Sequence, residues 1–130
     1  MEKINRYDMH PMVQAYLEAA LFADWPEENT PRSIFDATQA TIDAATADCM
    51  SFLNRAGEHG SAYLASDFAN SIGFEQVGHD FWLTRQGHGA GFWDRPEIYG
   101  EHQADGLAKL ARHYGQLNLH HTGGRYWAIA

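Results

Sequence analysis

The chain has 130 residues, with 17 Asp and Glu against 9 Lys and Arg and a formal net charge of -8. Its hydrophobic share of 45% and charged share of 20% exclude an intrinsically disordered protein. The single cysteine, Cys49, excludes a disulfide framework, a zinc finger and an iron–sulfur site, and no apolar run is long enough for a membrane span. No charged-then-apolar leader opens the chain, so we expect a cytoplasmic protein, and its acidic balance argues against binding to duplex DNA.

We expect one domain over residues 1–130, built from two parts of different composition. Residues 1–73 form an acidic, alanine-rich part that reads as helical, and residues 74–130 form a part rich in glycine and aromatic residues that reads as sheet-containing. The charge divides similarly, because residues 1–75 carry four bases and twelve acids, whereas residues 76–130 carry five of each.

Three helices are predicted in the first part. The first has Asp8 as its cap, Pro11 in its first turn and Trp25-Pro26 at its end. Its buried face repeats at helical spacing and consists of Met9, Met12, Val13, Tyr16, Leu17, Ala20 and Leu21.

The second helix is predicted to open at Thr30-Pro31, a capping residue followed by proline, and to end at Gly57. Its apolar seam consists of Phe35, Thr38, Ile42, Ala45, Cys49 and Phe52, so we expect Cys49 to be buried and inert. A short third helix is predicted from about Ala62 to Ile72.

The second part changes to the pattern of strands. Residues 79–85 are rich in aromatic side chains and predict a strand, residues 86–89 predict a turn, and residues 90–95 predict the returning strand, which Pro96 ends.

One more helix and a second hairpin are predicted after Pro96. The helix carries Leu107, Leu110, Ala111 and Tyr114 on one side and ends at Gly115. The hairpin pairs residues 117–121 with residues 125–129 around Thr122-Gly123-Gly124. The order α-α-α-β-β-α-β-β predicts an α+β fold, in which N-terminal helices pack on a small, mostly antiparallel sheet.

The densest local signal is the run from Gly78 to Arg95, GHDFWLTRQGHGAGFWDR. This run resembles the signature of a family of small uncharacterised proteins of bacteriophages and prophages. Chains of that family similarly begin with an alanine- and acid-rich helical part and end in a short strand pair. The resemblance implies a phage- or prophage-type accessory protein, and it brings no reaction, ligand or catalytic residue with it.

Gly91 lies inside the predicted returning strand, where glycine weakens a sheet unless something occupies the space beside it. One reading is a hairpin whose glycine is covered by a cross-strand aromatic ring. The other is a small binding groove with Gly91 as its floor and Trp82, Phe92 and Trp93 as its walls. In both readings the two tryptophans are large apolar groups, and we expect Trp93→Ala to impair folding.

Eight histidines raise the question of metal or acid–base chemistry. The side chains that could converge if the two hairpins are neighbours are His79, Asp80, His88, Asp94, His120 and His121. No histidine pair has the spacing of a common metal motif, so no metal or other cofactor is predicted. If the protein is an enzyme, the catalytic candidates are His79 with Asp80 and His88 with Asp94. Alternatively, the two aspartates pair with Arg85 or Arg95.

Acidic side chains in the first part suggest a function in binding. We expect Glu27, Glu28, Asp36 and Asp43 to form an acidic face for a host protein with a basic surface, unless they only keep the protein soluble. Phage accessory proteins gain more by blocking host machinery than by metabolism. Together with the acidic face, the resemblance to phage proteins implies a non-enzymatic protein of the host cytoplasm that binds, and inhibits, a host defence or nucleic-acid-handling complex. The alternative is a small-ligand-binding protein or enzyme with a His/Asp/Trp site on residues 79–95.

Overall fold

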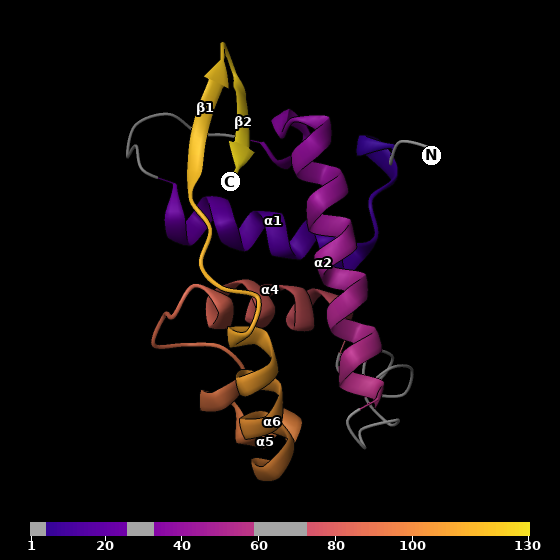
Figure 1. The fold of residues 1–130 in the computed structure, drawn as a ribbon, viewed down its shortest axis with the longest axis vertical. Coiled ribbons are helices and arrows are strands. Elements are labelled where there is room, and N and C mark those ends of the chain that lie inside the picture. The colour runs from indigo at the N-terminus through magenta and orange to yellow at the C-terminus, as the bar shows by residue number, and fades with distance from the viewer. Residues whose placement is uncertain (1–4, 26–32, 59–72) are drawn as a thin grey trace.

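A computed structural model describes residues 5–25, 33–58 and 73–130 (Figure 1). The elements in these ranges are η1 (Arg6–Asp8), α1 (Pro11–Asp24), η2 (Ile34–Asp36), α2 (Gln39–Glu58), α4 (Phe74–Arg85), η4 (Phe92–Asp94), α5 (Pro96–Tyr99), α6 (Glu101–Arg112), β1 (Leu119–Gly123) and β2 (Tyr126–Ile129). The predicted α+β class is confirmed, because the helices are accompanied by a small antiparallel sheet near the C-terminus. None of the helices in the described ranges is both long and apolar enough to cross a membrane.

The first predicted helix is confirmed as α1, but its cap differs from the prediction. His10 is the N-cap, and its Nδ1 accepts a hydrogen bond from the backbone N–H of Met12 at 3.1 Å. Asp8 instead belongs to the preceding turn η1. Burial lowers the pKa of His10 below its usual value, which favours the neutral ring that can accept this bond.

The second helix, α2, begins later than predicted, after Thr38, whose Oγ1 accepts from the N–H of Thr41 at 3.3 Å. Phe35 therefore lies in the separate turn η2, and α2 continues past Gly57 to Glu58. The rest of the predicted seam is buried, from Ile42 to Phe52. The predicted start at Thr30-Pro31 and the predicted helix at 62–72 lie outside the described residues.

The predicted strand at 79–85 is wrong, because these residues form the second half of helix α4. Val77, Phe81 and Trp82 are completely buried, and α4 is covered on several sides at once. A short apolar run of this kind does not show the one-sided periodicity that distinguishes a helix from a strand. The aromatic residues indicated a strand, and tertiary packing outweighed that preference.

The predicted returning strand at 90–95 is also wrong. Gly91 has a φ of 131°, outside the range of a strand, and the chain continues into the 3-10 turn η4. Pro96 starts α5, where a proline in the first turn lacks only an N–H that would have no helical partner. The predicted helix after Pro96 is confirmed as α6, but it ends at Arg112, before the predicted cap Gly115, which has a φ of 77°.

The second predicted hairpin is confirmed as β1 and β2, with Leu119 opposite Ile129 and His121 opposite Trp127. Its turn is at Gly124-Arg125 and not at the predicted Thr122-Gly123-Gly124, because Gly123 still pairs with Tyr126. This hairpin is the one sheet in the described part of the chain. The outer edge of β2 is bound by the start of α2, because Thr38 N donates to Trp127 O at 2.9 Å. Ile129 N likewise donates to Thr41 Oγ1 at 3.1 Å. This docking supports a two-stranded sheet that would be marginal alone.

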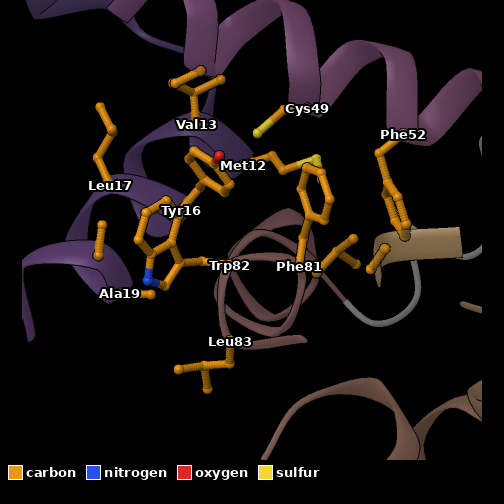
Figure 2. Packing of buried hydrophobic residues seen from close by; sticks show 14 of the residues in the cluster. Met12, Val13, Tyr16, Leu17, Ala19, Cys49, Phe52, Phe81, Trp82 and Leu83 are labelled. Carbon is orange, nitrogen blue, oxygen red and sulfur yellow. The ribbon is translucent and has the colours of Figure 1, made fainter. Parts of the chain in front are cut away.

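The core lies where α1, α2 and α4 meet (Figure 2). In the described ranges, α1 and α4 pack more extensively than any other two elements, and α2 crosses them (Figure 1). The Tyr16 ring of α1 meets the Trp82 ring edge-on at 5.1 Å, and Phe52 of α2 stacks on Phe81 of α4 at 4.4 Å.

The guanidinium of Arg85 is buried beside this core. Arg85, at the end of α4, donates to Tyr16 Oη at 2.9 Å, to Asp48 Oδ2 at 2.7 Å, and to the carbonyls of Tyr114 and Gly115 after α6. The carbonyls at a helix C-terminus carry partial negative charge, so the cation is matched to its surroundings. Arg85 therefore ties α1, α2 and α6 to α4.

Candidate functional site

A surface hollow of about 490 Å³ lies between α1 and α4, and we call it the α1/α4 groove. It is lined by Ala15, Glu18, Ala19, Phe22, Glu75, Gln76, His79 and Arg95. The α1 members recur at helical spacing, and so do Glu75, Gln76 and His79 on α4. The two adjacent helices thus form one continuous surface, which carries both charged and apolar side chains.

Phe22 has the most unusual position in this groove. Its side chain is 91% exposed, although burying a phenylalanine is worth about 1.5–3 kcal/mol. Ala15 and Ala19 beside it are buried and small, which leaves room over α1. An exposed ring beside a hollow of small residues is a common feature of binding surfaces.

The acidic members of the groove are Glu18 and Glu75, and both are exposed. Neither carboxylate has an ion-pair partner among the described residues. Their charges are therefore available to a ligand from solution.

Behind the groove lies a buried carboxylate, Asp80, which is completely inaccessible to solvent. Its Oδ1 accepts from Arg95 Nε at 3.0 Å, and its Oδ2 accepts from Tyr99 Oη at 2.5 Å and from Gln76 Nε2 at 2.9 Å. His79 Nδ1 lies 3.4 Å from Oδ1. These five residues, the Asp80 cluster, connect α4 to the segment 95–99.

The Asp80 cluster stabilises the positive charge of Arg95 at the edge of the groove. Burial by itself lowers the pKa of the guanidinium, but the charge and hydrogen bond of Asp80 outweigh burial and raise it above its usual value. Burial and the nearby carboxylate both raise the pKa of Tyr99 far above its usual value, so this hydroxyl stays a donor. The predicted alternative of an Asp80–Arg95 pair is thus confirmed.

The four catalytic candidates do not form one site. His79 and Asp80 are adjacent, with His79 in the groove and Asp80 behind it. The predicted pairing of His88 with Asp94 is wrong, because His88 Nε2 lies 3.0 Å from both carboxylate oxygens of Asp24, at the end of α1. Asp94 Oδ1 accepts from Gly91 N at 2.9 Å and so caps the turn η4.

The four residues of the predicted small groove do not form a groove. Trp82 is buried, and its Nε1 donates to Asp24 Oδ2 at 2.6 Å, whereas Phe92 packs on Phe52 in the core. A Cβ on Gly91 would lie 2.1 Å from Thr84 Oγ1, so the space beside this glycine is filled by α4. Trp93 is 48% exposed, and the expectation that it is a core residue is wrong.

The histidines and carboxylates that the structure describes do not gather around a common point. Across the described ranges, no three His, Cys, Asp or Glu side chains are placed to share a metal ion. His120 and His121 lie exposed on β1, and the His121 ring meets Trp25 edge-on at 5.1 Å.

The predicted acidic face is only partly described, because Glu27 and Glu28 lie outside the described residues. Asp36 pairs with Arg125 of the hairpin at 3.2 Å, and Asp43 accepts from Gln39 at 3.0 Å. Asp24 and Asp48 likewise pair with His88 and Arg85 of the second part. Three acids of the first part, Asp24, Asp36 and Asp48, therefore pair with the second part rather than forming a free acidic face.

Sequence reasoning missed Phe22 and Glu75. The signal for Phe22 was present, because it lies on the face of α1 that also carries Glu18, away from the predicted buried seam. Glu75 belonged to a segment without a predicted helix, so its place beside α1 could not be derived.

Comparisons with family models, with curated proteins and with solved structures find no match. The resemblance of residues 78–95 to phage proteins therefore stays a prediction.

Proposed function

We propose that the protein acts by binding another protein, and that the α1/α4 groove is the binding surface. The observation that carries this proposal is the combination of an almost fully exposed Phe22 with two acids, Glu18 and Glu75, on one hollow. Aromatic side chains, phenylalanine included, are enriched at protein–protein interfaces, and charged groups at the rim of an interface select the partner.

The charge of the groove indicates the chemistry of the partner. Asp80 offsets the charge of Arg95, so Glu18 and Glu75 leave the groove with net negative charge. Complementary charge accelerates association and discriminates among partners. The partner segment is therefore basic, with apolar groups that contact Phe22.

The biological setting of the proposal rests on the resemblance of residues 78–95 to phage and prophage proteins. In that setting the protein lies in the cytoplasm of a bacterial host and inhibits a defence or nucleic-acid-handling complex. Proteins of such complexes carry basic surfaces for nucleic acid, which an acidic groove complements.

A second candidate function is suggested by His79. Its ring lines the same groove, and its Nδ1 lies 3.4 Å from Oδ1 of the buried Asp80. A carboxylate that orients a histidine is a common arrangement in acid–base catalysis. Here, however, Asp80 already accepts from Arg95, Tyr99 and Gln76, which indicates a structural role. A ligand-binding or catalytic role would require His79→Gln to abolish function while partner binding persists.

The test of the proposal is affinity capture from bacterial lysate with three baits. These are the wild type, a groove variant (Glu18→Gln, Phe22→Ser, Glu75→Gln) and a control variant (Tyr7→Ser, Glu97→Gln, Asp105→Asn). The control removes the same kinds of exposed side chain elsewhere, since Tyr7 is 77% exposed. We expect a protein that the wild type and the control retain and the groove variant loses. Equal capture by all three, or no specific capture, would contradict the proposal.

A further inference from the structure

Arg95 adds a positive charge to the α1/α4 groove, whose other charged side chains, Glu18 and Glu75, are negative. Its Nε donates a hydrogen bond to Asp80 Oδ1, and its side chain is 29% exposed. Among the described residues, no hydrogen bond is made by its two Nη groups. The buried Asp80 carboxylate fixes the guanidinium from behind, so its outer N–H groups are held at the edge of the hollow.

A guanidinium presented in this way is suited to a carboxylate, because its parallel N–H donors match the two oxygens. A carboxylate alone would be repelled by Glu18 and Glu75, which line the same hollow. The groove therefore fits a group that carries both a carboxylate and a cation.

The C-terminal residue of a protein carries both charges when it is lysine or arginine. Its α-carboxylate and its cationic side chain belong to one residue, whereas an internal acidic side chain would need a second residue for the cation. Capture of a C-terminal carboxylate is a recurring mode of peptide recognition.

We infer that the α1/α4 groove binds a C-terminal Lys or Arg of the partner, with the α-carboxylate on Arg95 and the cationic side chain on Glu18 and Glu75. The exposed ring of Phe22 covers the aliphatic stem of that side chain. This inference rests on the proposed function and adds the identity of the docked segment.

The probes are short synthetic peptides, titrated into isotope-labelled full-length protein and followed by the shifts of its backbone amide signals. The first is acetyl-Gly-Leu-Lys with a free carboxylate, and the second is the same peptide as a carboxamide. The third, acetyl-Gly-Leu-Leu with a free carboxylate, lacks the cation. The fourth, acetyl-Gly-Asp-Lys carboxamide, carries its carboxylate on a side chain.

We expect the first peptide to shift the amides of residues 18–22 and 75–79 and to bind about tenfold more tightly than each of the others, as for one charge-assisted hydrogen-bonded contact. Arg95→Gln should remove the difference between acid and carboxamide, whereas Arg112→Gln, an exposed cation of α6, should preserve it. The comparison of peptides on the wild type needs no variant, so it stays valid if Arg95→Gln does not fold.

Two results would overturn the inference in different ways. If the carboxamide or the side-chain carboxylate binds as tightly as the free acid, a C-terminal carboxylate is not recognised, although the proposed function stands. If no lysine peptide shifts the groove amides and the capture experiment also fails, both proposals are wrong.

Discussion

Gly78 of α4 lies directly against the backbone of Met12 of α1, so closely that a Cβ on Gly78 would be 2.2 Å from Met12 O. Only glycine allows the two helices this approach, which brings the groove residues of α1 and α4 to one surface. A helical glycine is usually less stable than alanine by about 0.5–1 kcal/mol, because the unfolded chain is more flexible. At this position the sign should reverse.

Gly78→Ala should therefore destabilise the protein by about 1–3 kcal/mol, since the added methyl group forces the helices apart. The matched control is Gly106→Ala in α6, where nothing lies within 4 Å and the alanine should stabilise the fold by about 0.5–1 kcal/mol. Urea unfolding of both variants measures the difference. Two changes of the same sign would refute the proposed helix contact.

Arg85→Gln should be among the most damaging single changes. It leaves Asp48, Tyr16 Oη and the two carbonyls after α6 without their donor, and each buried acceptor left unsatisfied costs about 1–3 kcal/mol. Arg112→Gln, on the exposed face of α6, should change stability by less than about 0.5 kcal/mol. If chemical denaturation gave both variants the same stability, the interior role of Arg85 would be disproved.

Stability should fall at alkaline pH because of two buried tyrosines. Burial raises the pKa of Tyr16 and of Tyr99 above the usual value of about 10. The native state thus favours the neutral hydroxyls, so this stabilisation is complete below about pH 10 and is lost as the pH rises further. Each tyrosine adds up to about 1.4 kcal/mol per pH unit to the slope. Tyr99→Phe should lower the slope of unfolding free energy against pH, and an unchanged slope would show that Tyr99 titrates normally.

The two tryptophans of residues 78–95 should respond differently to truncation. Trp82 is completely buried and donates a hydrogen bond to Asp24, so Trp82→Ala should lower the free energy of unfolding by about 3–5 kcal/mol. Trp93 is 48% exposed, and Trp93→Ala should cost less than about 1 kcal/mol. Thermal unfolding followed by circular dichroism compares them. A larger loss for Trp93 than for Trp82 would mean that the orientation of η4 is different.

The parts of the fold that could be predicted are those with local signals. The C-terminal hairpin has glycine turn residues between alternating strands. Asp80 and Arg95 do pair, but they were weighed as partners across a hairpin at 79–95 that the structure replaces with α4 and η4. Residues 79–85 were misread because α4 is buried on several sides and shows no single apolar stripe. The α1/α4 groove depends on the approach of Gly78 to Met12, which no local pattern encodes.

The most direct test of the groove is the association rate of the captured partner, measured from low to high salt. The proteins compared are the wild type, Glu18→Gln/Glu75→Gln and the control Glu97→Gln/Asp105→Asn. We expect the groove variant to associate several-fold more slowly at low salt and to depend less on salt, whereas the control resembles the wild type, because charges at an interface act mainly on the association rate. Identical rates and salt dependence for the groove variant and the wild type would contradict recognition of a basic partner through Glu18 and Glu75.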